Sequence, residues 1–180
     1  MVNEQIPLEE IAQVMGRMIR EGKIRGWGLS QVSASVLNQA HQVTPVSAVQ
    51  NLYSMMERDC EQEIFPYCLE HGIGVVPFSP IASGFLSGKV TAATAFEGDD
   101  VRKFVPQLSP ENLAANQPIL DLLARFSQAK HATSAQISLP GMPPKAPNAV
   151  PIPGSKTREP KQETPAASPV SRPHLEETEG

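Results

Sequence analysis

Short apolar runs that alternate with amphipathic helical segments constrain the fold of this chain more than any other feature. The spacing between successive predicted strands is roughly 25 residues, which leaves room for one helix in each connection. The predicted strands are residues 24–30, 46–52 and 73–78, and the predicted helices are residues 8–22, 33–41 and 61–71. This alternation predicts an α/β fold whose parallel strands are joined by right-handed crossovers.

The pattern changes after the third strand. Residues 84–107 show no clear periodicity and are predicted to form a long loop. Ser109-Pro110-Glu111 predicts a helix start, because it combines a capping hydroxyl, a proline in the first turn and an acid near the positive end of the dipole. A further helix is predicted from Ala135, and a last strand over residues 149–152. The predicted buried face of the helix after Ser109 is Ile119, Leu122, Leu123 and Phe126.

Composition excludes several functional classes. A formal net charge of −4 without a basic stripe argues against a nucleic-acid partner. Cys60 and Cys68 lack the spacing of a metal or disulfide motif, so no metal is expected. Neither a signal peptide nor an apolar run of membrane-spanning length is found, which predicts a cytoplasmic protein without a membrane partner.

Prolines divide the chain into two predicted regions. More than half of the 18 prolines lie between Pro140 and Pro173, and the residues after Lys161 are rich in Pro, Glu, Ser and Thr. Such a composition cannot bury enough apolar surface to offset chain entropy. We therefore predict a folded domain over residues 1–157 and a disordered tail over residues 158–180.

Four short motifs lie at the carboxyl ends of predicted strands, where a parallel α/β barrel binds its ligands. In this order along the chain they resemble motifs in the second half of an aldo-keto reductase. The motifs are Gly26–Ser30, Gln50–Ser54, Pro77–Lys89 and Ile152–Lys156. The resemblance implies a partial (β/α)8 barrel containing strands five to eight, with the catalytic first half absent, and an NADP(H) cofactor.

The resemblance also implies residues that hold the nicotinamide and the pyrophosphate. Ser30, Gln31 and Gln50 stand where the family binds the carboxamide, although family members often carry Asn at the position of Gln31. Phe78 stands where the family stacks an aromatic ring on the nicotinamide. From the residues alone, Ser30 also fits a strand-end hydroxyl bonded to backbone, and Phe78 also fits plain core. The loop around the pyrophosphate would be formed by Ser79, Ile81, Ser83 and Gly84.

At the adenosine end, the resemblance assigns Ser155 and Lys156 to the 2′-phosphate, for which a hydroxyl and a cation are suitable partners. Glu163 matches a further residue near the adenosine. The chain departs from the family at Pro160 and Thr164, where members carry Arg and Asn nearby, and Arg158 is a candidate replacement for the missing Arg.

No catalytic residue is assigned. The family protonates its carbonyl substrate with a Tyr that Lys, Asp and His assist, and the resemblance places all four in the first half of the barrel. Tyr53 is predicted to end a strand and to face the cleft, whereas Tyr67 is predicted to be helix core. The histidines, among them His41 and His71, are predicted to be unconnected.

Two functional hypotheses follow. The first is an NADP(H)-dependent oxidoreductase in truncated form, acting on a small-molecule carbonyl substrate once a catalytic half completes it. The alternative is a non-catalytic nucleotide-binding or interaction module on the same scaffold, or the product of a decayed gene. Four strands of an eight-stranded barrel would leave open edges, so self-association is expected in either case.

Overall fold

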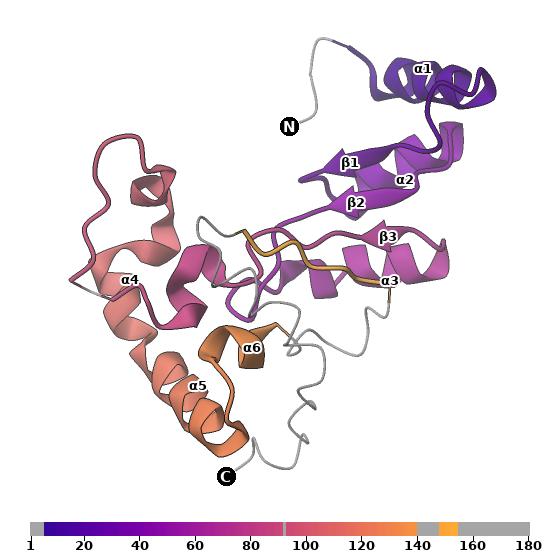
Figure 1. Ribbon diagram of the computed structural model, residues 1–180. Coiled ribbons are helices and arrows are strands. Elements are labelled where there is room, and N and C mark those ends of the chain that lie inside the picture. Colours follow the sequence, from indigo (N-terminus) through magenta and orange to yellow (C-terminus); the bar gives the residue numbers. More distant parts are fainter. Residues whose placement is uncertain (1–5, 92, 140–147, 155–180) are drawn as a thin grey trace. The chain divides into compact units, whose positions relative to one another are not determined.

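The computed structural model describes residues 6–91, 93–139 and 148–154, which fall into two compact units. The described part of the first unit comprises residues 6–78 and 148–152, and that of the second comprises residues 79–91, 93–139 and 153–154 (Figure 1). The predicted tail over residues 158–180 lies outside the described residues, as do Ser155, Lys156, Arg158 and Glu163.

The first unit contains a three-stranded parallel sheet in the order β1-β2-β3 (Figure 1). The alternation of strands and helices that the sequence predicts is confirmed, although each strand is shorter than predicted. In chain order the elements are α1 (Leu8–Arg20), β1 (Gly28–Ser30), α2 (Ala34–Val43), β2 (Ala48–Gln50), the 3-10 turn η1 (Asp59–Glu61), α3 (Ile64–Glu70) and β3 (Gly74–Val75).

Residues 148–152 continue this arrangement beside β3. Val75 donates its N–H to Asn148 O at 3.1 Å, and Val150 donates to Val75 O at 2.8 Å. Parallel bridges join Val75 to Ala149 and Phe78 to Ile152. The predicted last strand is therefore present as a pair of bridges, and the four parallel segments lie in chain order.

Local signals determine the helix ends of this unit. Ser33 caps α2, since its hydroxyl accepts the N–H of Val36 at 3.3 Å. Gly22 has φ +69° and follows the C-cap of α1, where its N–H and that of Lys23 return to Ile19 O and Met18 O. This is a Schellman motif, which favours glycine because an L side chain is strained at that φ.

The core of the first unit lies between the sheet and its helices. Val49 at the centre of β2 is fully buried, as expected for a parallel strand covered on both faces. Both cysteines are buried with free thiols. The largest side chains with less than 2% exposure here are Leu37, Val49, Phe65, Cys68, Ile73, Val75 and Pro77.

His41, Tyr67 and His71 form a cluster between α2 and α3, so the prediction that the histidines are unconnected was wrong. The Tyr67 and His71 rings stack at 4.0 Å, and the His41 and His71 rings meet edge to face at 5.5 Å. Tyr67 is half-buried rather than core, and its hydroxyl donates to Asn38 Oδ1 at 3.0 Å. Sequence reasoning missed the cluster because it depends on how two helices pack.

We expect His41 to make the stability of this unit sensitive to pH. Its Nδ1 accepts the N–H of Val46 at 3.1 Å, which requires an unprotonated nitrogen. Burial and then the nearby His71 lower the pKa of His41 below its ordinary value of 6.5. The unfolded chain therefore binds this proton more readily, and the free energy of unfolding should decrease as the pH falls below about 6.5.

His41→Asn tests this prediction, because the Asn oxygen can accept the Val46 N–H but does not titrate. Urea unfolding of both proteins between about pH 5 and 8 should give a shallower pH dependence for the variant. Equal slopes for the two proteins would show that His41 is not the group responsible.

The second unit consists of short helical elements. The described residues of the region that the sequence predicts as a loop, 84–91 and 93–107, include all or part of three 3-10 turns. In chain order the elements are η2 (Ala82–Ser87), η3 (Val101–Phe104), η4 (Pro106–Leu108), α4 (Pro110–Ala115), α5 (Gln117–Lys130) and α6 (Ser134–Ser138).

Ser109 caps α4 as predicted, accepting the N–H of Asn112 at 3.3 Å. The predicted buried face is only partly correct, because Leu123 is buried whereas Leu122 is 44% exposed. None of the helices in the described segments is long and apolar enough to cross a membrane.

Candidate functional site

The register of the sheet brings several predicted site residues together in the first unit. Ser30 and Gln50 are Cα partners at the ends of β1 and β2, and the Gln31 N–H donates to Gln50 O at 2.9 Å. Just beyond, Leu52 forms a parallel bridge with Phe78, whose N–H donates to Asn51 O at 3.1 Å. Ser30, Gln50 and Phe78 thus follow one another along the same edge of the parallel array.

The exposure of these residues suits a ligand. Ser30 and Gln31 are exposed, while Gln50 and Phe78 are half-buried. Val49, which precedes Gln50, is fully buried. The strand end therefore presents polar groups and part of an aromatic residue above an apolar core, an arrangement typical of small-molecule sites.

The side chain of Gln31 is already engaged. Its Oε1 accepts the N–H of Leu52 at 2.8 Å, and its backbone has φ +53°. Sequence reasoning placed Gln31 beside Ser30 as a ligand, but could not reveal this bond because it joins residues on different strands.

Tyr53 is buried, so the prediction that it faces a cleft was wrong. It is 2% exposed, and its hydroxyl donates to Glu61 Oε1 at 2.7 Å. Arg58 in turn holds both carboxylate oxygens of Glu61, at 2.6 and 2.9 Å. Burial and the bond to Glu61 raise the pKa of Tyr53 well above its ordinary value. A general acid needs a pKa near the working pH, so Tyr53 is unsuited to that role.

In the second unit, the loop from Ser79 is tightly wound. Ser79, Ala82, Ser83 and Gly84 all have positive φ, with Gly84 at +101°. Three of these residues donate their N–H groups within the loop: Ala82 to Ser79 O, Ser83 to Ser79 Oγ at 3.1 Å and Gly84 to Ile81 O. The Ser79 and Ser83 hydroxyls lie 3.2 Å apart. In this conformation the hydroxyls, more than these amides, are the groups that can meet a ligand.

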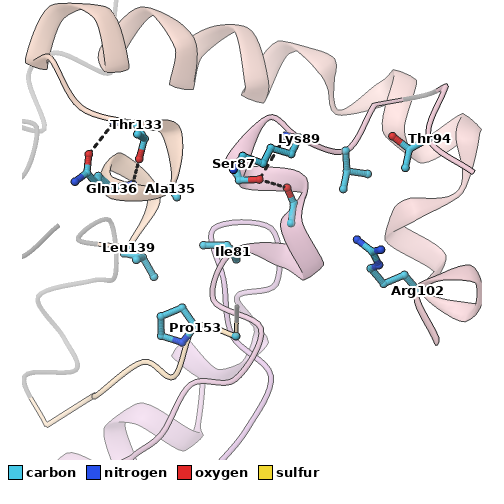
Figure 2. Close-up of a pocket in the computed structure, with 13 residues that line it drawn as sticks. Ile81, Ser87, Lys89, Thr94, Arg102, Thr133, Ala135, Gln136, Leu139 and Pro153 are labelled. Atoms are coloured by element: carbon cyan, nitrogen blue, oxygen red, sulfur yellow. Dashed lines mark hydrogen bonds between the residues drawn. The ribbon is translucent and has the colours of Figure 1, made fainter. Parts of the chain in front are cut away.

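A cavity of about 520 Å³ lies in the same unit (Figure 2). It joins two segments that the sequence singled out, because Ile81 and Gly84 line it together with Pro153 and Gly154. The remaining lining residues are Ser87, Lys89, Val90, Thr94, Arg102, Thr133, Ala135, Gln136 and Leu139.

The cavity combines cations, hydroxyls and apolar side chains. Arg102 is held by Asp100, with Nη2 2.5 Å from Oδ2. Lys89 is exposed, and no carboxylate among the described residues forms an ion pair with it. Thr133 and Gln136 form the capping box that starts α6, as Figure 2 shows.

Sequence reasoning missed Arg102 because it lies in an aperiodic segment. The Thr-x-x-Gln spacing of residues 133–136, by contrast, is a recognisable signal for a helix start.

Comparison with known proteins identifies the family. The family model described as "Aldo/keto reductase family" matches residues 1–172. The chain belongs to the aldo/keto reductase family. It is 34% identical over 154 residues to a protein named probable aldo-keto reductase 1 from Glycine max, an alignment covering 86% of this chain and 44% of that relative.

Solved structures show the same fold. A glycerol dehydrogenase from Gluconobacter oxydans matches with a TM-score of 0.78 at 22% identity, over 98% of this chain and 53% of that one. An aldo/keto reductase from Klebsiella pneumoniae in complex with NADP and acetate matches with a TM-score of 0.70 at 22% identity, over 98% and 53%. The chain spans about half the length of these relatives.

Proposed function

We propose that the chain is the cofactor-binding half of an NADP(H)-dependent aldo-keto reductase, with its four parallel segments corresponding to strands five to eight of the barrel. The observation that carries this proposal is the pairing of Ser30 with Gln50 at adjacent strand ends. A Gln amide offers both a donor and an acceptor, and therefore complements the carboxamide of a nicotinamide. Phe78, which bridges to Leu52 two residues beyond Gln50, supplies an aromatic residue for the ring.

The cavity of the second unit, considered by itself, carries groups suited to the phosphate-bearing part of NADP(H). Lys89 and Arg102 supply positive charge, and Thr94 and Thr133 supply hydroxyls. Ile81, Val90 and Leu139 line the cavity with apolar side chains suited to an adenine base. Ser155 and Lys156, which follow the lining residue Gly154, are proposed to contact the 2′-phosphate, and Glu163 to lie near the adenosine.

Bound NADPH would supply a hydride to a small carbonyl compound. The residues of this chain would bind and orient the nicotinamide: Gln50 and Ser30 hold the carboxamide, and Phe78 covers one face of the ring. Because Tyr53 is buried and its pKa is raised, the proton donor is not this tyrosine. We propose that the Tyr acid comes from the other half of a complete barrel.

Self-association is a related proposal. Residues 148–152 lie on the far side of β3 from β2, and this segment exposes two apolar side chains, Val150 at 67% and Ile152 at 44%. Within the described part of the chain no further segment bridges to it on the other side. Apolar side chains on such an edge favour pairing with another chain. A complementary barrel half or a second copy of this chain would cover them.

Gln50→Ala should weaken NADPH binding about tenfold, since the loss of one or two hydrogen bonds costs about 1.4 kcal/mol. Calorimetric titration of the full chain measures the effect. Gln42→Ala is the matched control, because Gln42 is an exposed amide at the end of α2 and contributes nothing to the strand ends. Equal affinities for the Gln50→Ala and wild-type chains would contradict the assignment.

Activity separates the enzyme from a binding module. We expect a mixture of this chain, the first half of a related barrel, NADPH and a small aldehyde to oxidise NADPH. The decrease in the absorbance of NADPH measures the rate. Binding without turnover in that mixture would favour a non-catalytic module, and absence of binding would overturn the cofactor proposal.

A further inference from the structure

Two side-chain amides join the ends of β1 and β2 beyond the last backbone pair. Gln31 Oε1 accepts the N–H of Leu52 at 2.8 Å. In the opposite direction, Asn51 accepts the N–H of Val32 through Oδ1 at 3.3 Å and donates to Val32 O through Nδ2 at 2.9 Å. We call Gln31 and Asn51, with these three bonds, the amide clasp.

The clasp replaces backbone pairing at the point where the two strands separate. Gln31 leaves the strand conformation with φ +53°, which ends the β1–β2 ladder after Ser30 and Gln50. Leu52 then bridges to Phe78 on the next segment. A positive φ at a residue other than glycine is strained by roughly 1 kcal/mol or more, and persists only where surrounding bonds determine it.

Backbone bonds and chain continuity connect the clasp residues to every strand-end residue that we assign to the nicotinamide. Gln31 is bonded through its own N–H to Gln50 O and follows Ser30 directly. Asn51 O accepts the N–H of Phe78, and the N–H of Tyr53 returns to Phe78 O at 3.4 Å. A change at Gln31 would therefore alter the relative positions of Ser30, Gln50 and Phe78.

We propose that Gln31 is a positioning residue and not a ligand of the cofactor: its amide oxygen fixes Leu52, and the clasp sets the spacing of the strand ends that hold the nicotinamide. This inference rests on the proposed function. It gives Gln31 a different role from the one that its place beside Ser30 suggests, because its Oε1 is already bonded to the N–H of Leu52.

Gln31→Ala and Gln31→Glu distinguish the two roles, and Gln31 is exposed, so both variants should fold. Glutamate keeps an oxygen for the Leu52 N–H but loses the amide donor that contact with a carboxamide would use. We expect the affinity for NADPH to fall about tenfold in Gln31→Ala and to remain within about twofold of wild type in Gln31→Glu.

Two further readouts report on the mechanism. Adenosine 2′,5′-bisphosphate lacks the nicotinamide, so its affinity should be unchanged in Gln31→Ala, whereas general loosening of the fold would weaken both ligands. Amide hydrogen exchange of Leu52 in the free protein should accelerate in Gln31→Ala but not in Gln31→Glu, because only alanine removes the acceptor.

Three outcomes would overturn the inference. Unchanged Leu52 exchange in Gln31→Ala would show that the bond is not held in solution. Equal loss of NADPH affinity in the Ala and Glu variants would identify Gln31 as a direct ligand. A wild-type chain that binds no NADPH would refute the proposed function and with it the positioning role, while Leu52 exchange would still show whether the clasp exists.

Discussion

Replacing Phe65 with alanine is expected to lower the free energy of unfolding of the first unit by about 3–5 kcal/mol. Phe65 on α3 is 1% exposed, and its ring lies 4.8 Å from that of Tyr53. Removing the ring loses its burial and leaves a cavity that rigid neighbours fill only partly. It also removes the support of Tyr53, whose N–H bonds to Phe78 O at the proposed nicotinamide site.

Urea unfolding followed by fluorescence measures this effect, because Trp27 is the only tryptophan of the chain and lies buried in the first unit. Leu69→Ala is the control, since Leu69 is on the same helix but is 50% exposed. The control should change the free energy by about 0.5 kcal/mol or less. Similar losses for the two variants would mean that the structure misplaces the core-facing side of α3.

Gly28→Ala is expected to destabilise the same unit by about 2–3 kcal/mol, as overpacking typically does. A Cβ at Gly28 would lie 2.6 Å from the carbonyl oxygen of Ala48, its partner in the β1–β2 pair. That oxygen belongs to backbone and cannot rotate away, so the two strands would have to separate. Because Ser30 and Gln50 end these strands, the affinity for NADPH should fall with the stability.

Gly74→Ala provides a matched control for this prediction. Gly74 in β3 also pairs with Ala48, but a Cβ there would meet its nearest atoms at ordinary contact distances of 3.5 and 3.8 Å. Its replacement should leave the unfolding midpoint in urea nearly unchanged or slightly raised, because alanine reduces the entropy of the unfolded chain. If Gly28→Ala proves as stable as Gly74→Ala, the close approach of β1 and β2 is incorrect.

Features of the fold that depend on local chemistry could be predicted from the sequence. Ser33 and Ser109 cap their helices and Gly22 ends α1, because each acts on backbone groups a few residues away. The alternation of strands and helices also required only the pattern of apolar residues. The pattern of apolar residues does not determine the lengths of the strands, because each strand ends where its pairing with the neighbouring strand ends. In β1 that happens at Gln31, whose backbone leaves the strand conformation.

At the candidate site, too, local features could be predicted from the sequence and contacts between distant residues could not. The resemblance pointed to Ser30, Gln50 and Phe78, and the structure places them near one another because strand ends meet at one edge of a parallel sheet. Tyr53 was misjudged because its burial depends on Phe65 and Glu61, both later in the chain. The cations of the cavity gave no periodic signal, and the bond of Gln31 to Leu52 joins two strands.

We propose above all that these strand ends bind the nicotinamide of NADP(H). Amide chemical-shift mapping of the 15N-labelled chain during titration with NADPH is a direct test of this binding. We expect saturable shifts at Gln31, Gln50 and Phe78, and at Gly84 and Lys89 in the second unit. Titration with adenosine 2′,5′-bisphosphate should shift only the latter group. Shifts confined to α1 and α4, or no shifts at millimolar NADPH, would contradict it.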